Sequence, residues 1–135
     1  MCAAALGIAW AHRAFLRQER EVKLLYVENH AIFVQIAVER FLAAHDVTVT
    51  GSVSGALALL ASETFDAVLV DYDLDDGKGS DVIRSLRERG SRIPVIAVSA
   101  KSDGNAELIK AGADAVCGKM EFAKIESILA TVCPG

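Results

Sequence analysis

Short apolar runs alternate with helical segments five times between residues 22 and 132, and this alternation restricts the possible folds more than any other feature of the chain. The apolar runs are rich in strand-forming residues, and apolar positions three or four residues apart mark the helices between them. The expected strands are 22–27, 47–50, 67–70, 94–98 and 115–117, and the expected helices are 30–45, 54–62, 81–89, 105–111 and 122–132. Such alternation favours right-handed crossovers, a parallel sheet and helices on both faces. The expected fold class is therefore α/β, a doubly wound sandwich of five βα repeats.

The length and composition fit one globular domain with a short extension at its start. The chain has 135 residues, of which 53% are hydrophobic and 24% charged, enough to bury a core. We expect an N-terminal extension over 1–21 and one folded domain over 22–135. The extension has a weak helical pattern and is expected to be helical or disordered, and its apolar start is too short to cross a bilayer. It is interpreted as a chain-end extension or a self-packing helix, with a partner-binding helix as the alternative.

Charge and cysteine content exclude several classes of function. The chain carries 18 acidic and 14 Lys or Arg residues, for a net charge of −4. It lacks the basic excess that nucleic acid and anionic lipid attract, so we expect neither direct nucleic-acid binding nor membrane binding. Three cysteines are an odd number in a domain that needs no disulfide, which favours reduced thiols and a cytoplasmic location.

Polar residues stand where four of the five expected strands end. The first strand is followed by Glu28 and Asn29, the third by Asp71, the fourth by Ser99 and the fifth by Lys119. In parallel α/β sheets, ligands bind at the carboxyl ends of the strands. Each residue taken alone has an ordinary explanation, such as a helix cap, a turn hydroxyl or a surface lysine. Their ordered placement instead favours one shared site.

The motifs that contain these residues resemble those of a response-regulator receiver domain, the phospho-acceptor module of two-component signalling. The resemblance covers roughly residues 22 to 133 and rests on YVEN (26–29), VLVDYDLDDGKG (68–79), VIAVSA (95–100) and GADAVCGK (112–119). It implies that 22–135 is a receiver domain with the strand order 2-1-3-4-5.

The resemblance also implies a phosphoryl-transfer chemistry that the residue types can support. A carboxylate is a weak nucleophile and a phosphoryl donor is anionic, so the site must cancel charge. Asp71 would be the phospho-acceptor, Lys119 would balance a phosphoryl oxygen and the Ser99 hydroxyl would donate to another. The donor would be a histidine kinase or phosphotransfer protein, and the modified domain would change its binding to a downstream effector protein. No enzymatic activity is expected beyond self-catalysed phosphotransfer and hydrolysis at Asp71.

The expected cofactor is Mg²⁺, which prefers hard oxygen ligands. By resemblance its ligands would be Glu28, Asn29, Asp71 and the backbone carbonyl of Asp73. Asn29 replaces the second acid of the family, which removes one charge from the site. Opposite charges about 4 Å apart attract by about 4 kcal/mol at an effective dielectric of about 20, and even a third of this predicts a roughly tenfold loss of Mg²⁺ affinity.

Three further positions depart from the family pattern. Asp75 replaces a common Pro, and Met120 replaces the Pro that often follows the pocket lysine, so no cis peptide is expected there. Val116 occupies the position of the switch aromatic and is otherwise expected to be a buried strand residue. Asp73 and Lys101 carry opposite charges and are hypothesised to pair across the mouth of the pocket.

Two other functions remain as alternatives. Asn29 and Val116 are compatible with a degenerate receiver that acts as a phosphorylation-independent interaction module. The sequence Asp71-Tyr72-Asp73 also matches the DxD motif of haloacid-dehalogenase-type phosphatases, although that motif would lie on the third strand and no cap insertion is present.

Overall fold

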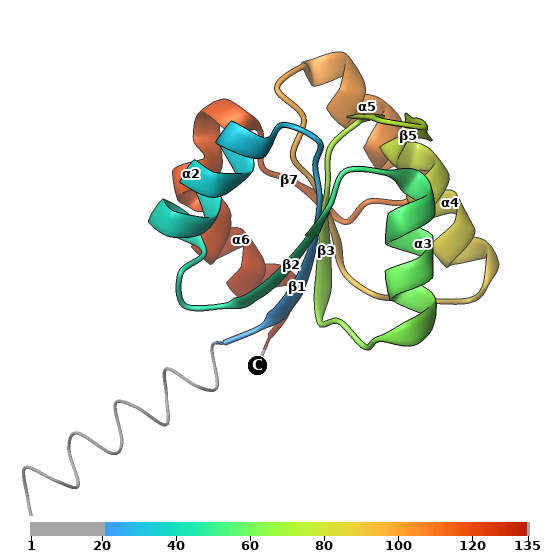
Figure 1. Cartoon of the computed structure of the whole chain (residues 1–135), viewed down its shortest axis with the longest axis horizontal. Helices are drawn as coiled ribbons and strands as arrows, with labels where there is room; N and C mark the ends of the chain where they lie inside the picture. Colours follow the sequence, from blue (N-terminus) through green and yellow to red (C-terminus); the bar gives the residue numbers. More distant parts are fainter. Residues whose placement is uncertain (1–20, 135) are drawn as a thin grey trace, which may run out of the picture.

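The computed structural model describes residues 21–134, so the expected N-terminal helix lies outside the described part. Five parallel strands form one sheet in the spatial order β2-β1-β3-β6-β7 (Figure 1). Their bounds are β1 Lys23–Val27, β2 Asp46–Thr50, β3 Ala67–Val70, β6 Val95–Ala97 and β7 Ala115–Val116. Counted along the chain, this order is 2-1-3-4-5, which confirms the expected doubly wound sandwich.

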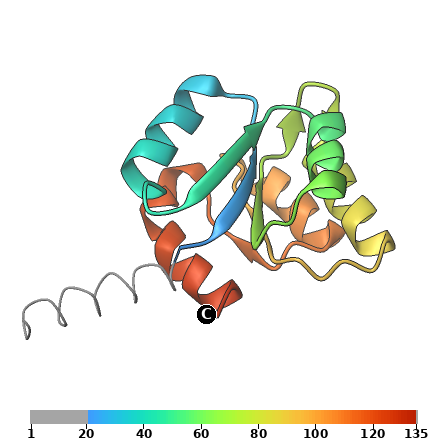
Figure 2. The ribbon, with the colours of Figure 1, turned by 60° about the horizontal axis from the view of Figure 1, so that its bottom comes forward.

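Helices cover both faces of the sheet (Figures 1 and 2). One face carries α2, the 3-10 segment η1 and α6, and the other carries α3, α4 and α5. Their bounds are α2 Ala31–Phe41, α3 Val53–Ser62, α4 Gly79–Glu88, α5 Ser102–Ala111, η1 Lys119–Lys124 and α6 Ile125–Val132. None of these described helices combines the length and apolarity needed to span a membrane.

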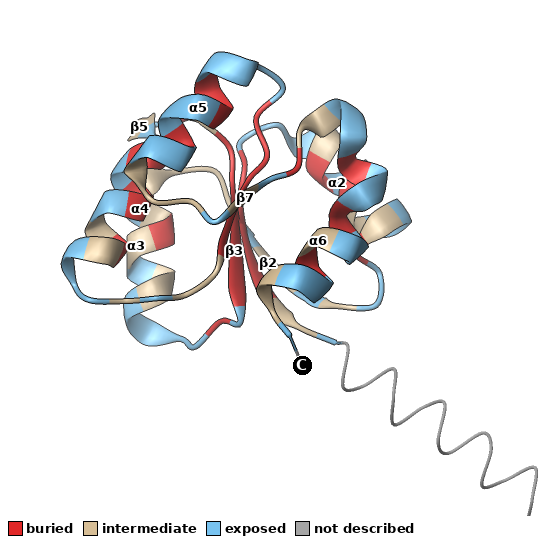
Figure 3. Ribbon diagram, turned by 180° about the vertical axis from the view of Figure 1, so that it is seen from behind, coloured by how far each residue is buried: buried red, intermediate tan, exposed pale blue. Residues whose placement is uncertain are grey.

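The central strands are apolar on both sides because each side faces a separate core (Figure 3). Along β1, Leu24 and Tyr26 pack with α2 and α6, whereas Leu25 and Val27 pack with α3, α4 and α5. All four side chains are fully buried. Because both faces of β1 are buried, every residue in its centre must be apolar. This explains the uninterrupted apolar run that indicated a strand in the sequence.

Most element boundaries lie within three residues of the expectation, and the last expected helix, 122–132, begins as the 3-10 segment η1. Two differences are larger. The first helix was expected to reach His45 but ends at Phe41, with Leu42 leaving the helical conformation and the His45 ring packed against other segments. Its Nδ1 accepts a hydrogen bond of 3.1 Å from the backbone N–H of Val22, and its Nε2 lies 2.5 Å from a Glu126 carboxylate oxygen. After β3 the chain forms an unexpected antiparallel hairpin of β4, Asp73–Leu74, and β5, Gly77–Lys78.

Candidate phospho-acceptor site

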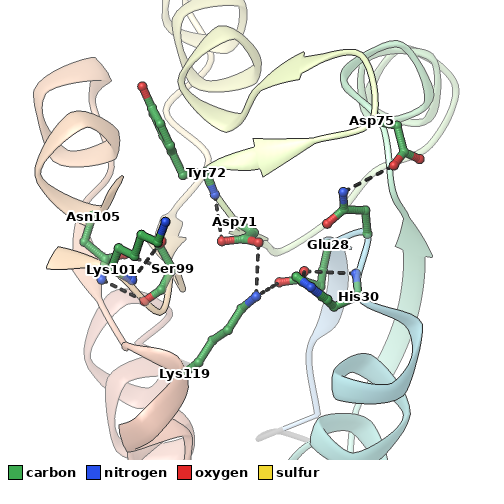
Figure 4. Close-up of polar contacts among 10 residues, drawn as sticks. Glu28, His30, Asp71, Tyr72, Asp75, Ser99, Lys101, Asn105 and Lys119 are labelled. Atoms are coloured by element: carbon green, nitrogen blue, oxygen red, sulfur yellow. Dashed lines mark hydrogen bonds and ion pairs between the residues drawn. The ribbon is translucent and has the colours of Figure 1, made fainter. Parts of the chain in front are cut away.

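An ammonium group held between two carboxylates forms the centre of the site (Figure 4). Lys119 Nζ lies 2.9 Å from Glu28 Oε2 and 3.1 Å from Asp71 Oδ2. Glu28 follows β1, Asp71 follows β3 and Lys119 begins η1 just after β7. Three distant segments of the sequence therefore meet at the carboxyl edge of the sheet, with Ser99 beside them at the end of β6 (Figure 4).

Backbone contacts fix the position of Asp71. Its N–H donates to the carbonyl of Val27 at 2.9 Å, and its Oδ1 accepts from the N–H of Tyr72 at 2.8 Å. The start of α4 lies directly against it, because a Cβ on Gly79 would come within 2.0 Å of the Asp71 carbonyl oxygen. Asp71 is only 5% exposed, so its carboxylate is held at a defined place with limited access to solvent.

Glu28 is more deeply buried than Asp71, at 2% exposure. Burial raises the pKa of Glu28, and the nearby Asp71 charge adds to this. Hydrogen bonds from Lys119 and from the backbone N–H of His30, at 3.1 Å, act to lower it. Two buried carboxylates therefore share one partly buried ammonium, which leaves the site with excess negative charge.

Aromatic packing positions Lys119. The Lys119 ammonium lies 5.1 Å from the centre of the Phe33 ring, within range of a cation–π interaction. Three aromatic rings surround Phe122 of η1, with centroid distances of 6.0 Å to Tyr26, 5.8 Å to Phe33 and 5.9 Å to Phe41. Burial acts to lower the pKa of Lys119, but its hydrogen bonds to the two carboxylates outweigh this and raise it. Lys119 is therefore a charged group.

Ser99 begins a hydrogen-bonded segment, residues 99–105, that runs into the first turn of α5. The Ser99 N–H donates to Asn105 Oδ1 at 2.9 Å, and Asn105 Nδ2 donates back to the Ser99 carbonyl at 3.0 Å. Ser99 Oγ accepts from the N–H of Lys101 at 3.2 Å, so its own proton remains available for donation. Sequence reasoning missed Asn105, for which the only signal is a polar residue in the first half of a helix beside the site.

Asn29 is exposed and binds the hairpin through Asp75. Asn29 Nδ2 donates to Asp75 Oδ1 at 3.2 Å. The next hairpin residue, Asp76, accepts from the N–H groups of Val53 at 2.6 Å and Ser54 at 3.0 Å, at the start of α3. These backbone hydrogen bonds lower the pKa of Asp76. The loop after Asp71 is thus fastened to two neighbouring segments.

Two local expectations were wrong. The Asp73 carboxylate pairs with Lys78 across the hairpin, not with Lys101, and the hydrogen bond from Lys78 is the main cause of its lowered pKa. Val116 is 42% exposed instead of buried, because β7 is the edge strand of the sheet. The peptide bond between Lys119 and Met120 is trans, in agreement with the expectation for a chain that lacks Pro at this position.

The donor atoms fit a divalent cation. Glu28, His30 and Asp71 each offer a ligand atom, and these atoms all lie within 4.8 Å of one another. Two buried carboxylates with one counter-charge supply hard oxygen ligands of the kind that Mg²⁺ takes. His30, which the sequence did not indicate, offers a ring nitrogen, which Mg²⁺ takes less readily than oxygen, so it is not among the ligands proposed below.

Comparisons with known proteins agree with this arrangement. The family model for the response regulator receiver domain matches residues 24–130, and the chain belongs to this family. The chain is 32% identical over 83 residues to response regulator protein PilR of Pseudomonas aeruginosa; the match covers 59% of this chain and 19% of that protein.

Solved structures show the same fold. A Francisella response regulator 1452 receiver domain is 23% identical, with a TM-score of 0.70, over 82% of this chain and 98% of that one. The receiver domain of sensor histidine kinase PA1611 from Pseudomonas aeruginosa PAO1, with magnesium in its active-site cleft, is 24% identical, with a TM-score of 0.73, over 85% and 99%. A signal receiver domain of an HD domain-containing protein from Pseudomonas fluorescens Pf-5 is 18% identical, with a TM-score of 0.76, over 85% and 88%.

Proposed function

We propose that this receiver domain accepts a phosphoryl group on Asp71 from a histidine kinase or phosphotransfer protein. One observation carries the proposal: the Lys119 ammonium lies within 3.1 Å of both the Asp71 and Glu28 carboxylates at the edge of the sheet. The cation is placed where negative charge collects during transfer to a carboxylate.

In this step a carboxylate oxygen of Asp71 attacks the phosphorus of a phosphohistidine. The new O–P bond forms as the P–N bond breaks, and the imidazole nitrogen leaves with the bonding electron pair and takes up a proton from water. The product is an acyl phosphate on Asp71. Lys119 balances one phosphoryl oxygen, and the Ser99 hydroxyl donates its free proton to another.

We propose Mg²⁺ as the cofactor, held by the carboxylates of Glu28 and Asp71, the amide oxygen of Asn29 and the backbone carbonyl of Asp73. Bound Mg²⁺ would neutralise charge on the transferred group. The two buried carboxylates with one shared ammonium support this, as does the magnesium in the cleft of the PA1611 receiver domain.

The response of the domain would be a change in binding to a downstream effector protein. Phosphorylation would add charge and strong acceptor oxygens beside Ser99, and residues 99–105, joined by the hydrogen bonds between Ser99 and Asn105, would be the segment that meets them. Val116 has no aromatic ring to rotate, so the proposed readout is movement of this segment.

We place the reaction in the cytoplasm, in keeping with the free thiols of Cys117 and Cys133.

Intact mass spectrometry with acetyl phosphate, with and without millimolar Mg²⁺, tests the proposal. One phosphoryl adduct that requires Mg²⁺ and is lost in Asp71→Asn is the expected result. Absence of an adduct in the wild-type protein would instead support the phosphorylation-independent interaction module, which Asn29 and the exposed Val116 favour. Steady turnover of a generic phosphate ester would support the phosphatase alternative.

A further inference from the structure

Two departures from the family pattern, Asn29 and Asp75, contact each other in the structure. Asn29 stands in place of the second acid and lacks its charge, while Asp75 brings a carboxylate to the loop after the acceptor strand. The two side chains are joined by the 3.2 Å hydrogen bond from Asn29 Nδ2 to Asp75 Oδ1. We propose that they divide the role of one carboxylate: Asn29 supplies an oxygen ligand to the divalent cation, and Asp75 orients that oxygen and supplies the charge.

The hydrogen bond determines which way the Asn29 amide faces. A carboxylate only accepts hydrogen bonds, so the NH₂ group of Asn29 must be the arm that contacts Asp75. The oxygen lies on the other arm of the same planar group and is therefore turned away from Asp75. A flipped amide would bring two oxygens together without a proton between them. Asp75 thus orients the Asn29 side chain so that its amide oxygen is free to act as a ligand.

Asp75 is held in place independently of Asn29. Its backbone N–H donates to the carbonyl of Gly51 at 3.1 Å. A Cβ on Gly51 would lie 3.1 Å from Asp75 Oδ2 and 3.3 Å from the Cα of Asn29, so the glycine leaves room for both residues. Asp76, the next residue, is bonded to the start of α3. The backbone of Asp75 is therefore anchored independently of Asn29, and this places its exposed carboxylate within reach of the Asn29 amide.

The charge of Asp75 is not cancelled by a neighbouring cation. Within residues 21–134, Asp75 makes no salt bridge, whereas Asp73 is paired with Lys78. This carboxylate is one hydrogen bond away from Asn29, a proposed ligand. Outer carboxylates that orient metal ligands contribute strongly to metal affinity in other proteins. This inference rests on the proposed Mg²⁺ role of the site and names a positioning residue for it.

Calorimetric titration of the full chain with Mg²⁺ separates the two roles of Asp75. Asp75→Asn keeps a hydrogen-bond acceptor but removes the charge, and we expect it to weaken Mg²⁺ binding about threefold; Asp75→Ala removes both and should weaken it about tenfold. In an Asn29→Ala background, the difference between these two variants should disappear. Equal losses in Asp75→Asn and Asp75→Ala would overturn the orienting role, and no loss in either would overturn the whole inference.

A swap and a control complete the experiment. Asn29→Asp with Asp75→Asn keeps the net charge and moves the carboxylate to the ligand position, so it should restore at least wild-type affinity; failure to do so, with thermal melting unchanged, would contradict the inference. Asp103→Asn, which removes an exposed carboxylate from the first turn of α5, should stay within about twofold of wild type. A twofold or greater loss there would assign the effect to general charge.

The titration also separates this inference from the proposed cofactor. If the wild type binds Mg²⁺ and Asp75→Ala binds it equally well, only this inference fails. If the wild type does not bind Mg²⁺, the proposed cofactor fails as well.

Discussion

The Tyr26 hydroxyl is buried in the core and has no hydrogen-bond partner among the described residues. Burial raises its pKa, with further contributions from Glu28 and Asp71, so the group is a neutral phenol. The ring itself packs against Phe122 with centroids 6.0 Å apart. The hydroxyl is thus a desolvated polar group on an otherwise well-packed aromatic side chain.

We expect Tyr26→Phe to raise the free energy of unfolding by about 1 kcal/mol, because it removes an unpaired buried hydroxyl and keeps the ring contacts. Urea unfolding followed by circular dichroism measures this. A loss of stability of similar size would show that the hydroxyl makes a stabilising contact.

Several residues of the site could be predicted from the sequence, and others could not. Glu28, Asp71, Ser99 and Lys119 were identifiable because each lies at or within two residues of the end of an expected apolar strand, and strand ends are visible in a sequence. Asn105 was not identifiable, because its contacts with Ser99 depend on how α5 is placed. Lys78 was missed for the same reason: its pairing with Asp73 requires a hairpin that the sequence did not indicate.

Helix α3 begins at a carboxylate that comes from a different element. The Asp76 side chain accepts the N–H groups of Val53 and Ser54, whereas Ser52 caps the helix locally by accepting from Gly55 at 3.0 Å. Two caps of different origin therefore satisfy the first turn of α3 and join it to the β4–β5 hairpin.

Asp76→Asn is expected to lower the melting temperature at pH 7, and the difference should disappear in acid. The pKa of Asp76 is lowered in the folded state, so its contribution to stability is present above the unfolded-state value of about 3.9 and is lost as the pH falls through the lower folded value. Thermal melts of both proteins between pH 7 and pH 2 test this. A difference independent of pH would mean that the charge of Asp76 is not involved.

The helices and strands that the sequence predicted well are those with long apolar patterns. Helix α3 was expected at 54–62 and is Val53–Ser62, and β3 is found at the expected Ala67–Val70. The hairpin was missed because β4 and β5 have two residues each, too few for an alternating pattern. The burial of Val116 was misjudged because strand propensity does not distinguish an edge strand from a central one.

The whole molecule consists of two cores that share one sheet. Leu24 and Leu25 are neighbours on β1 and both are fully buried, but they belong to opposite cores. Each central strand contributes alternate side chains to both cores. Loss of either core should therefore disrupt the shared sheet and unfold the entire domain.

We expect Leu24→Ala and Leu25→Ala each to cost about 2–5 kcal/mol while unfolding remains a single transition. Urea titration followed in parallel by far-ultraviolet circular dichroism and tyrosine fluorescence measures both quantities. Two separate transitions in either variant would show that the faces unfold independently.

The attachments of the two loops beside Asp71 give the domain a mechanical asymmetry. The hairpin side is clamped, because Asp75 and Asp76 bond to the segment from Gly51 to Ser54. On the opposite side, the side-chain hydrogen bonds of Ser99 and Asn105 all close within residues 99–105, so none of them ties this segment to the hairpin. We therefore expect a change that begins at the acceptor carboxylate to be held back on the hairpin side, which would make α5 the element that carries it to the surface.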